Sequence, residues 1–136
     1  MQIRLMGLSF VAAVSLQAAT ILNVSFETPS LGLGNFQYDP AGATWTFSGS
    51  SGIAANGSAM GYAAAPNGTQ AAFLQGGGAS FSEMITSVNV GDVVNFWEAQ
   101  RPGFVANSFN VVYNGNVIGS FTPASTTWTE VSVIRC

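Results

Sequence analysis

The sequence predicts an all-β protein, folded as an antiparallel β-sandwich. Runs rich in β-branched and aromatic residues alternate with glycine at intervals of about eight to twelve residues, which is typical of a sandwich or barrel. After the first twenty or so residues, apolar side chains do not keep helical spacing for more than about two turns. Asn114 and Gly115 separate two alternating runs, and this pair indicates a hairpin because both turn positions require a positive φ.

The predicted strands follow one another to the end of the chain. In order they are 21–27, 43–47, 52–54, 70–75, 79–88, 92–100, 108–113, 116–121 and 127–134. Segments 28–40 and 56–68 contain glycine and proline and are predicted as loops. In the sixth strand Val94 and Phe96 face one way and Trp97 the other, so we expect a central strand covered on both faces.

The first residues have the organisation of a secretory signal peptide. Arg4 precedes an apolar run over 5–14, and small residues close it. We therefore expect a signal helix over 1–19 and one exported domain over 20–136, secreted or held at the surface of a bacterium. The apolar run is too short to span a bilayer, so we expect no stable membrane span in the mature chain.

Charged residues make up only 7% of the chain, against about 25% in an average globular domain. Lysine is absent, and after the predicted signal the only cations are Arg101 and Arg135. Nucleic-acid binding needs several cations to neutralise phosphates, so we exclude it. A charge-poor surface rich in Asn, Ser, Thr, Gln and Gly suits a neutral polysaccharide, and it is equally common on extracellular β-proteins that bind no ligand.

The residue types present argue against an enzyme. Histidine and lysine are absent and the only cysteine is Cys136, so neither a disulfide within the chain nor a Ser-His or Cys-His arrangement can form. Zinc and redox metals lack their usual ligands. Glu83 and Glu98 lie in neighbouring predicted strands, as a glycosidase pair would, but chance placement of six carboxylates accounts for this.

Aromatic side chains are the candidates for ligand binding, because planar rings stack on the apolar faces of sugars. Tyr38, Tyr62 and Phe104 lie in predicted loops and are the candidate ligand residues. For these three residues, packing in the core is the alternative. Three tryptophans lie in predicted strands, where core packing is expected: Trp45, Trp97 and Trp128.

Arg101 is the only cation in the body of the predicted domain. It follows a predicted strand and precedes Pro102. It is either a guanidinium that contacts a ligand or the partner of Glu83, Glu98 or another carboxylate in an ion pair that ties a loop to a strand. We include it among the candidate ligand residues.

Six short segments occur in an order that is found in a known family. They read NVSFETP at 23–29, WTF at 45–47, NGTQAAFLQ at 67–75, FWEAQRP at 96–102, YNG at 113–115, and FTP at 121–123 followed by Trp128. In order and spacing they resemble the secreted galactose-binding-like β-sandwich family, in particular bacterial exported proteins that carry a C-terminal PEP-CTERM sorting signal. Carbohydrate-binding modules with a jelly-roll topology begin in a similar way.

The resemblance implies a jelly-roll domain with a non-catalytic role at the cell surface or in the matrix of exopolysaccharide-producing bacteria. A carbohydrate-binding module detached from a larger glycan-active enzyme is the alternative. In similar jelly rolls the Glu of the opening segment helps to hold a structural Ca²⁺, which implies Glu27 and Asn23 as candidate ligands. The alternative is that Glu27 is solvated or bonded to loop N–H groups.

Two features of the family are missing from the sequence. They are a last strand that contains an Asp, and the sorting tail with its Val-Pro-Glu-Pro motif, apolar helix and basic residues. We therefore expect that the domain is truncated after Cys136. A strand without its neighbour exposes unpaired N–H and C=O groups, so residues 20–136 alone are expected to be marginally stable and prone to aggregate.

Overall fold

The computed structural model describes residues 21–134, and these form nine β-strands and no helix. Every pair of neighbouring strands is antiparallel, so the predicted class is confirmed: an antiparallel all-β protein, consistent with a β-sandwich. This part of the chain has no helix of the length and apolarity that crossing a bilayer requires. The predicted signal peptide, Arg135 and Cys136 lie outside the described residues.

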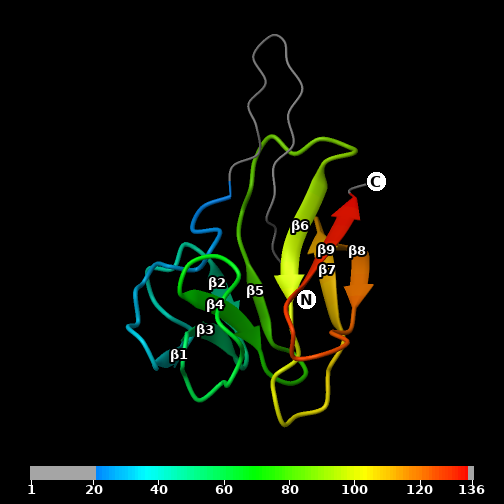
Figure 1. Ribbon diagram of the computed structural model, residues 1–136. Helices are drawn as coiled ribbons and strands as arrows, with labels where there is room; N and C mark the ends of the chain where they lie inside the picture. Colours follow the sequence, from blue (N-terminus) through cyan, green and yellow to red (C-terminus); the bar gives the residue numbers. More distant parts are fainter. Residues whose placement is uncertain (1–20, 135–136) are drawn as a thin grey trace.

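The strands of the described residues form four small sheets (Figure 1). The first half of the chain supplies a three-stranded sheet in the order β1-β3-β4 and a β2-β5 pair, and the second half supplies the pairs β6-β9 and β7-β8. The strands are β1 (Phe36–Tyr38), β2 (Thr46–Ser48), β3 (Ser51–Ala55), β4 (Gln70–Leu74), β5 (Ser80–Ser82), β6 (Val93–Glu98), β7 (Phe109–Tyr113), β8 (Asn116–Phe121) and β9 (Thr129–Ile134).

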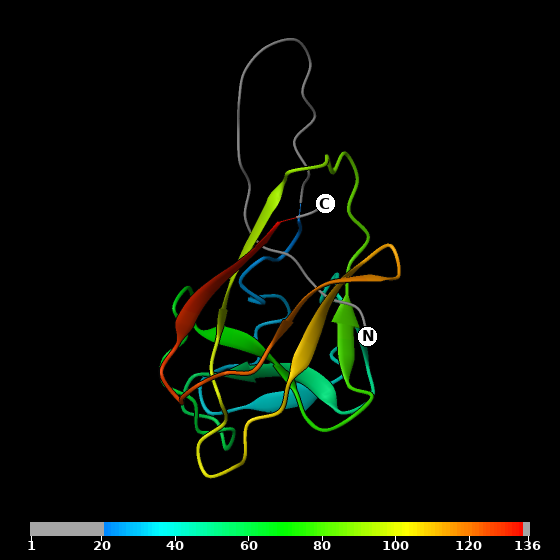
Figure 2. The ribbon, with the colours of Figure 1, turned by 90° about the vertical axis from the view of Figure 1, so that its right-hand side faces the viewer.

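Two clusters of buried side chains form the core, one in each half of the chain. The first is centred on Trp45 and Ile53, and the second on Val111 and Val133. The second cluster lies where the β6-β9 pair and the β7-β8 hairpin face each other (Figure 2). Ile21 packs against both clusters. Since no ladder of hydrogen bonds joins the four sheets, side-chain packing holds the two halves together.

The predicted hairpin is confirmed at the level of single residues. Asn114 and Gly115 have φ values of 47° and 78°, and Tyr113 pairs with Asn116 on either side of them. Two positive φ angles in a two-residue loop match the twist of the flanking strands. The hairpin forms where predicted because its signal is local.

The predicted first strand, 21–27, is wrong. The segment consists of turns, in which the Phe26 N–H donates to the Asn23 carbonyl at 3.0 Å and both residues have a positive φ. The side-chain amide of Asn23 donates to the carbonyls of Thr28 and Ala43 at 2.6 and 2.8 Å, and its Oδ1 accepts the Thr28 N–H at 2.9 Å. Such bonds from an Asn side chain compete with a strand ladder.

Four other predictions differ from the structure. The predicted loop 28–40 contains β1, and the predicted strand 79–88 contains only the three residues of β5. Among the described residues β6 pairs with β9 alone, so it is not a central strand. Trp97 on its outer face is 44% exposed and does not belong to the core, whereas Trp45 is buried as predicted.

Candidate ligand-binding cavity

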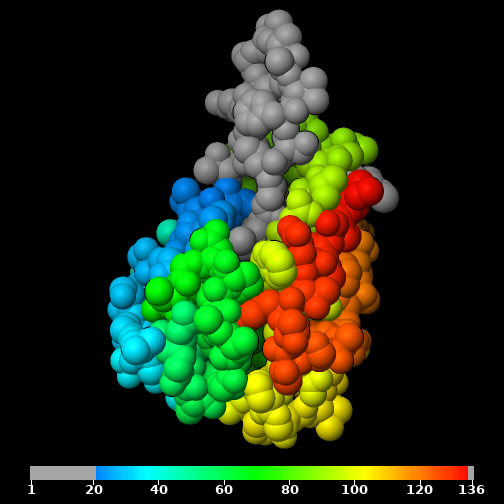
Figure 3. Space-filling model, viewed as in Figure 1, coloured from blue at the N-terminus to red at the C-terminus, as the bar shows by residue number. Residues whose placement is uncertain are grey.

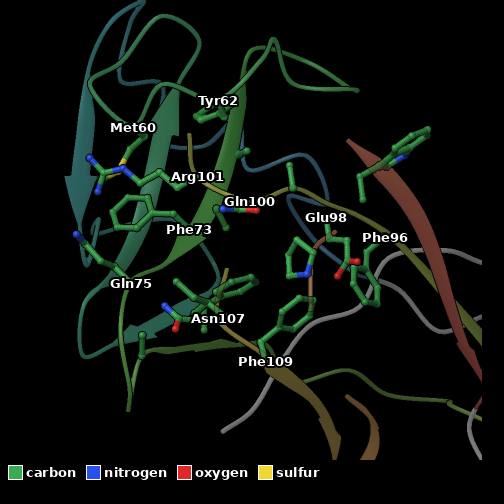
Figure 4. Close-up of a pocket in the computed structure, with 18 of the residues that line it drawn as sticks. Met60, Tyr62, Phe73, Gln75, Phe96, Glu98, Gln100, Arg101, Asn107 and Phe109 are labelled. Atoms are coloured by element: carbon green, nitrogen blue, oxygen red, sulfur yellow. The ribbon is translucent and has the colours of Figure 1, made fainter. Parts of the chain in front are cut away.

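A cavity of about 490 Å³ lies between the two halves of the described chain (Figure 4). The first half contributes β4 with the segments beside it, and the second half contributes the end of β6, the loop that follows and the start of β7. Apolar side chains from both halves line it: Met60, Phe73, Phe96 and Phe109. Small-molecule sites have volumes of about 300 to 1,000 Å³, so this cavity is large enough to hold a ligand.

The polar side chains of the lining are mostly neutral amides. Gln75, Gln100 and Asn107 are among them (Figure 4). Of the lining residues that the structure describes, only Glu98 and Arg101 carry a charge. Rings and amides in one cavity offer both apolar contact and hydrogen bonds to a polar, uncharged ligand.

The loop after β6 closes one end of the cavity and forms the yellow end of the molecule in Figure 3. The Gln100 N–H donates to the Ser125 carbonyl at 2.8 Å, and the Gln100 side-chain amide donates to the Phe104 carbonyl. The Phe104 N–H donates to the Arg101 carbonyl at 3.3 Å. The guanidinium carbon of Arg101 lies 4.2 Å from the centre of the Phe104 ring, so a cation–π contact stiffens this loop.

Arg101 connects the two halves without an ion pair. Its guanidinium donates to the Ala59 carbonyl at 3.3 Å, and its Nε is buried with no hydrogen-bond partner among the described residues. The predicted ion pair with Glu83 or Glu98 does not form within residues 21–134, because the side chain extends beside Met60 instead (Figure 4).

Tyr62 and Trp128 make the second connection between the halves. Their rings meet edge to face with centres 5.7 Å apart, and the Trp128 indole N–H donates to the Ala63 carbonyl at 2.9 Å. The Tyr62 hydroxyl donates to the Ala54 carbonyl. Burial, and secondarily the Glu27 carboxylate, raises the pKa of Tyr62 to about 12, so the phenol is neutral. Both rings line the cavity, and Trp128 is half-buried there and not in a core cluster.

Tyr38, the remaining aromatic candidate, lies outside the cavity lining. Its ring is 45% exposed on β1, and it contacts Phe73 edge to face with the centres 5.2 Å apart. Its hydroxyl donates to Gln75, which does line the cavity. The structure thus brings Tyr62, Phe104 and Arg101 to one cavity and leaves Tyr38 outside the lining, on the edge strand β1, beside the lining residues Phe73 and Gln75.

Glu27 is bonded to the loop before β4. Its Oε1 accepts the N–H groups of Thr69 and Gln70 at 2.8 and 2.9 Å, and its Oε2 accepts the Thr69 hydroxyl at 2.8 Å. Asn23, the other candidate calcium ligand, is engaged by Thr28 and Ala43. Within residues 21–134 no three acidic, His or Cys side chains gather.

Calcium requires six to eight oxygen ligands. The groups that bond to Glu27 are hydrogen-bond donors, which supports the alternative, a carboxylate bonded to loop N–H groups. Calcium binding by Glu27 and Asn23 stays a prediction, and ligand binding in the cavity does not depend on it.

The sequence did not predict Gln75, Gln100 or Asn107 as cavity residues, and Glu98 was considered only as a carboxylate paired by chance with Glu83 and as a partner for Arg101. Glu98 is the last residue of β6, and strand alternation places it on the inner face with Val94 and Phe96. Its Oε2 is buried without a hydrogen-bond partner among the described residues, and this burial raises the pKa of the carboxyl. The sequence did indicate its position, because Glu98 follows Val94 and Phe96 at alternate positions of one strand and so shares their face.

No protein-family model, curated protein or solved structure matches the chain. The resemblance to galactose-binding-like and PEP-CTERM proteins therefore stays a prediction.

Proposed function

We propose that this chain is a non-catalytic extracellular β-sandwich module that binds a neutral segment of a polysaccharide. The observation that carries the proposal is the lining of the cavity between its halves, where aromatic rings from both halves lie among amide side chains. Rings such as Tyr62 and Phe104 suit the apolar faces of a pyranose, and Gln75, Gln100 and Asn107 suit its hydroxyl groups.

The charges of the lining and of the chain favour a neutral ligand over a polyanion. One carboxylate, Glu98, and one guanidinium, Arg101, cancel each other in the lining. The whole sequence has a formal net charge of −3, which repels a polyanion at long range. An uncharged glycan does not experience this repulsion.

The proposed extracellular location is inferred from the sequence. The predicted signal peptide and the resemblance to jelly-roll, PEP-CTERM-type proteins support a place at the cell surface or in an exopolysaccharide matrix. A carbohydrate-binding module that once accompanied a glycan-active enzyme is the alternative, and it uses the same cavity. The absence of His and Lys supports a module that binds without catalysis.

Affinity electrophoresis through gels that contain neutral polysaccharides tests the proposal; dextran, galactomannan and xyloglucan form a suitable panel. A polysaccharide that binds retards the protein, and Phe104→Ala and Gln100→Ala weaken the apparent affinity. We expect about a fivefold loss for Phe104→Ala, since a ring contact contributes on the order of 1 kcal/mol. Met84→Ala is the control, because it removes a 90% exposed apolar side chain outside the lining.

Two outcomes contradict the proposal in different ways. If Tyr38→Ala abolishes retardation and Phe104→Ala does not, the ligand binds at β1 and the cavity is not the site. If no polysaccharide retards the unaltered protein, the chain is a structural matrix component without a glycan ligand.

A further inference from the structure

Three Asn-Gly pairs occur in the sequence, and this pair is chemically reactive. The backbone nitrogen of the glycine attacks the side-chain carbonyl of the Asn, because glycine has no Cβ in the way and reaches the dihedral angles that ring closure needs. In a folded protein, the reaction of each pair depends on how firmly its Asn is held. The three pairs are Asn56-Gly57, Asn67-Gly68 and Asn114-Gly115.

Asn56 is held by its side chain and by its backbone. Its Oδ1 accepts the Ala65 N–H at 2.9 Å. Its own N–H donates to the Thr69 carbonyl at 2.8 Å, and its carbonyl accepts the Gly34 N–H at 2.9 Å. Ring closure at Asn56 must break the side-chain bond and turn a fixed backbone, so the fold protects this residue.

Asn67 is the least restrained of the three. It is exposed, its side chain forms no hydrogen bond within residues 21–134, and it lies in a bend before β4, outside any strand ladder. Asn114 is also exposed, but the pairing of Tyr113 with Asn116 fixes the backbone on both sides of its turn. Asn67 therefore reaches the geometry for ring closure most easily.

The fold requires the glycine that follows Asn67. Gly68 has a φ of 72°, and a Cβ at this position would lie 2.3 Å from the Oε1 of Glu27. That oxygen accepts the N–H groups of Thr69 and Gln70, so a side chain at position 68 would push the carboxylate away from its partners. At the glycines of the other two pairs a Cβ would meet nothing closer than 3.9 Å. The close approach of Glu27 thus requires the residue type that makes Asn67 reactive.

We propose that Asn67-Gly68 is a site of spontaneous modification, at which Asn67 becomes aspartate or isoaspartate and the attachment of Glu27 to β4 weakens. The Gly68 nitrogen loses its proton and forms a bond to the Asn67 Cγ. The Cγ–Nδ2 bond breaks, and ammonia leaves with that proton. Water then opens the cyclic imide at one of its two carbonyls, which gives aspartate or isoaspartate without any change of oxidation state.

Both products change the start of β4. Each places a carboxylate two residues before Thr69, whose N–H and hydroxyl bind Glu27, and like charges repel. Isoaspartate also lengthens the main chain by one carbon just ahead of these groups. Asn67 is among the residues that line the cavity, so the modification adds a negative charge to the lining, whatever ligand the cavity binds.

Peptide mapping by mass spectrometry tests the site, after the protein is aged for several days in mildly alkaline buffer. In the folded protein we expect Asn67 to convert at least about tenfold faster than Asn56, whose hydrogen bonds must break first, and faster than Asn114. In guanidinium chloride all three should convert at similar rates, which shows that the fold causes the difference. Conversion at Asn67 that is no faster than at Asn56 or Asn114 in the folded protein overturns the inference.

Thermal melts test the effect on Glu27. Ageing should lower the melting temperature of the unaltered protein by a few degrees and leave that of Asn67→Gln unchanged, because the longer Gln side chain closes a ring far less readily. Asn116→Gln is the matched control, since it makes the same change at an exposed Asn that precedes valine, and it should lose stability as the unaltered protein does. An equal fall in Asn67→Gln, or no fall in unaltered protein that has converted at Asn67, overturns the inference.

Discussion

Glu27 and Gln70 are 43 residues apart in the sequence, and the side chain of each forms hydrogen bonds with backbone groups at or beside the other. Glu27 accepts the Gln70 N–H at 2.9 Å, and the Gln70 side-chain amide donates to the carbonyls of Phe26 and Pro29 at 2.5 and 3.0 Å. Gln70 is 3% exposed, and its Oε1 also accepts the Leu31 N–H at 2.7 Å. These bonds fasten the irregular segment before β1 to the start of β4, a strand that lines the cavity.

Replacing Glu27 by Ala is expected to lower the free energy of unfolding by about 2 to 3 kcal/mol, because three hydrogen bonds to a charged acceptor are lost. Thr69→Val removes only the hydroxyl bond and should cost about 1 kcal/mol. Urea denaturation of both variants measures the difference. Equal losses in the two variants would show that the backbone bonds to Glu27 contribute nothing.

Removing divalent cations is expected to leave the melting temperature unchanged, because both oxygens of Glu27 already accept hydrogen bonds from the chain. Differential scanning fluorimetry with EDTA, and then with added calcium, measures this. A fall in melting temperature that calcium reverses would contradict the expectation and show that the folded protein binds calcium, as the family resemblance implies.

Gly52→Ala is expected to destabilise the protein by about 3 kcal/mol. A Cβ at Gly52, in the middle strand of the β1-β3-β4 sheet, would lie 2.0 Å from the Gln37 carbonyl oxygen, so β1 would have to move away. Gly77→Ala is the control, since nothing lies within 4 Å of its Cβ, and it should change stability by less than about 0.5 kcal/mol. Similar thermal melts for both variants would mean that β1 contributes little to stability.

The sequence predicted those strands whose signals are local. The β7-β8 hairpin follows from Asn114 and Gly115, and β6 and β9 follow from long alternating runs. β1 was not predicted, because a strand of three residues exists only through its pairing with β3. The segment 21–27 was predicted as a strand because its apolar pattern conceals the local hydrogen bonds of Asn23.

The cavity was predicted only in part. Tyr62, Phe104 and Arg101 were candidates and line it, whereas Tyr38 looked equivalent in the sequence and lies outside it. Exposure of a loop aromatic can be predicted from local pattern, but the direction it faces depends on which sheets pack together. Glu98 was missed as an unpaired acceptor for the same reason, since its state depends on where the Arg101 side chain goes.

Two buried carboxyl oxygens are expected to make the stability of the protein depend on pH. The Oε2 atoms of Glu83 and Glu98 are both buried without a partner among the described residues. Burial raises the pKa of both side chains above the ordinary value of 4.5, and for Glu83 the bond from the Leu22 N–H opposes part of the rise. The folded state therefore holds these protons at a pH where the unfolded chain has released them.

It follows that the contribution of these two groups to stability is greatest below the ordinary carboxyl pKa and is lost as the pH rises through the raised values of the folded state. We expect the melting temperature to rise as the pH falls from 7 toward about 4.5. Glu83→Gln and Glu98→Gln should each raise the melting temperature at pH 7 and flatten its dependence on pH, because Gln carries no charge to desolvate.

Glu130→Gln is the control, because it removes an exposed charge and should leave the slope of melting temperature against pH nearly unchanged. If Glu130→Gln flattens the slope as much as Glu98→Gln does, the overall charge of the protein governs the pH dependence and the two buried oxygens do not.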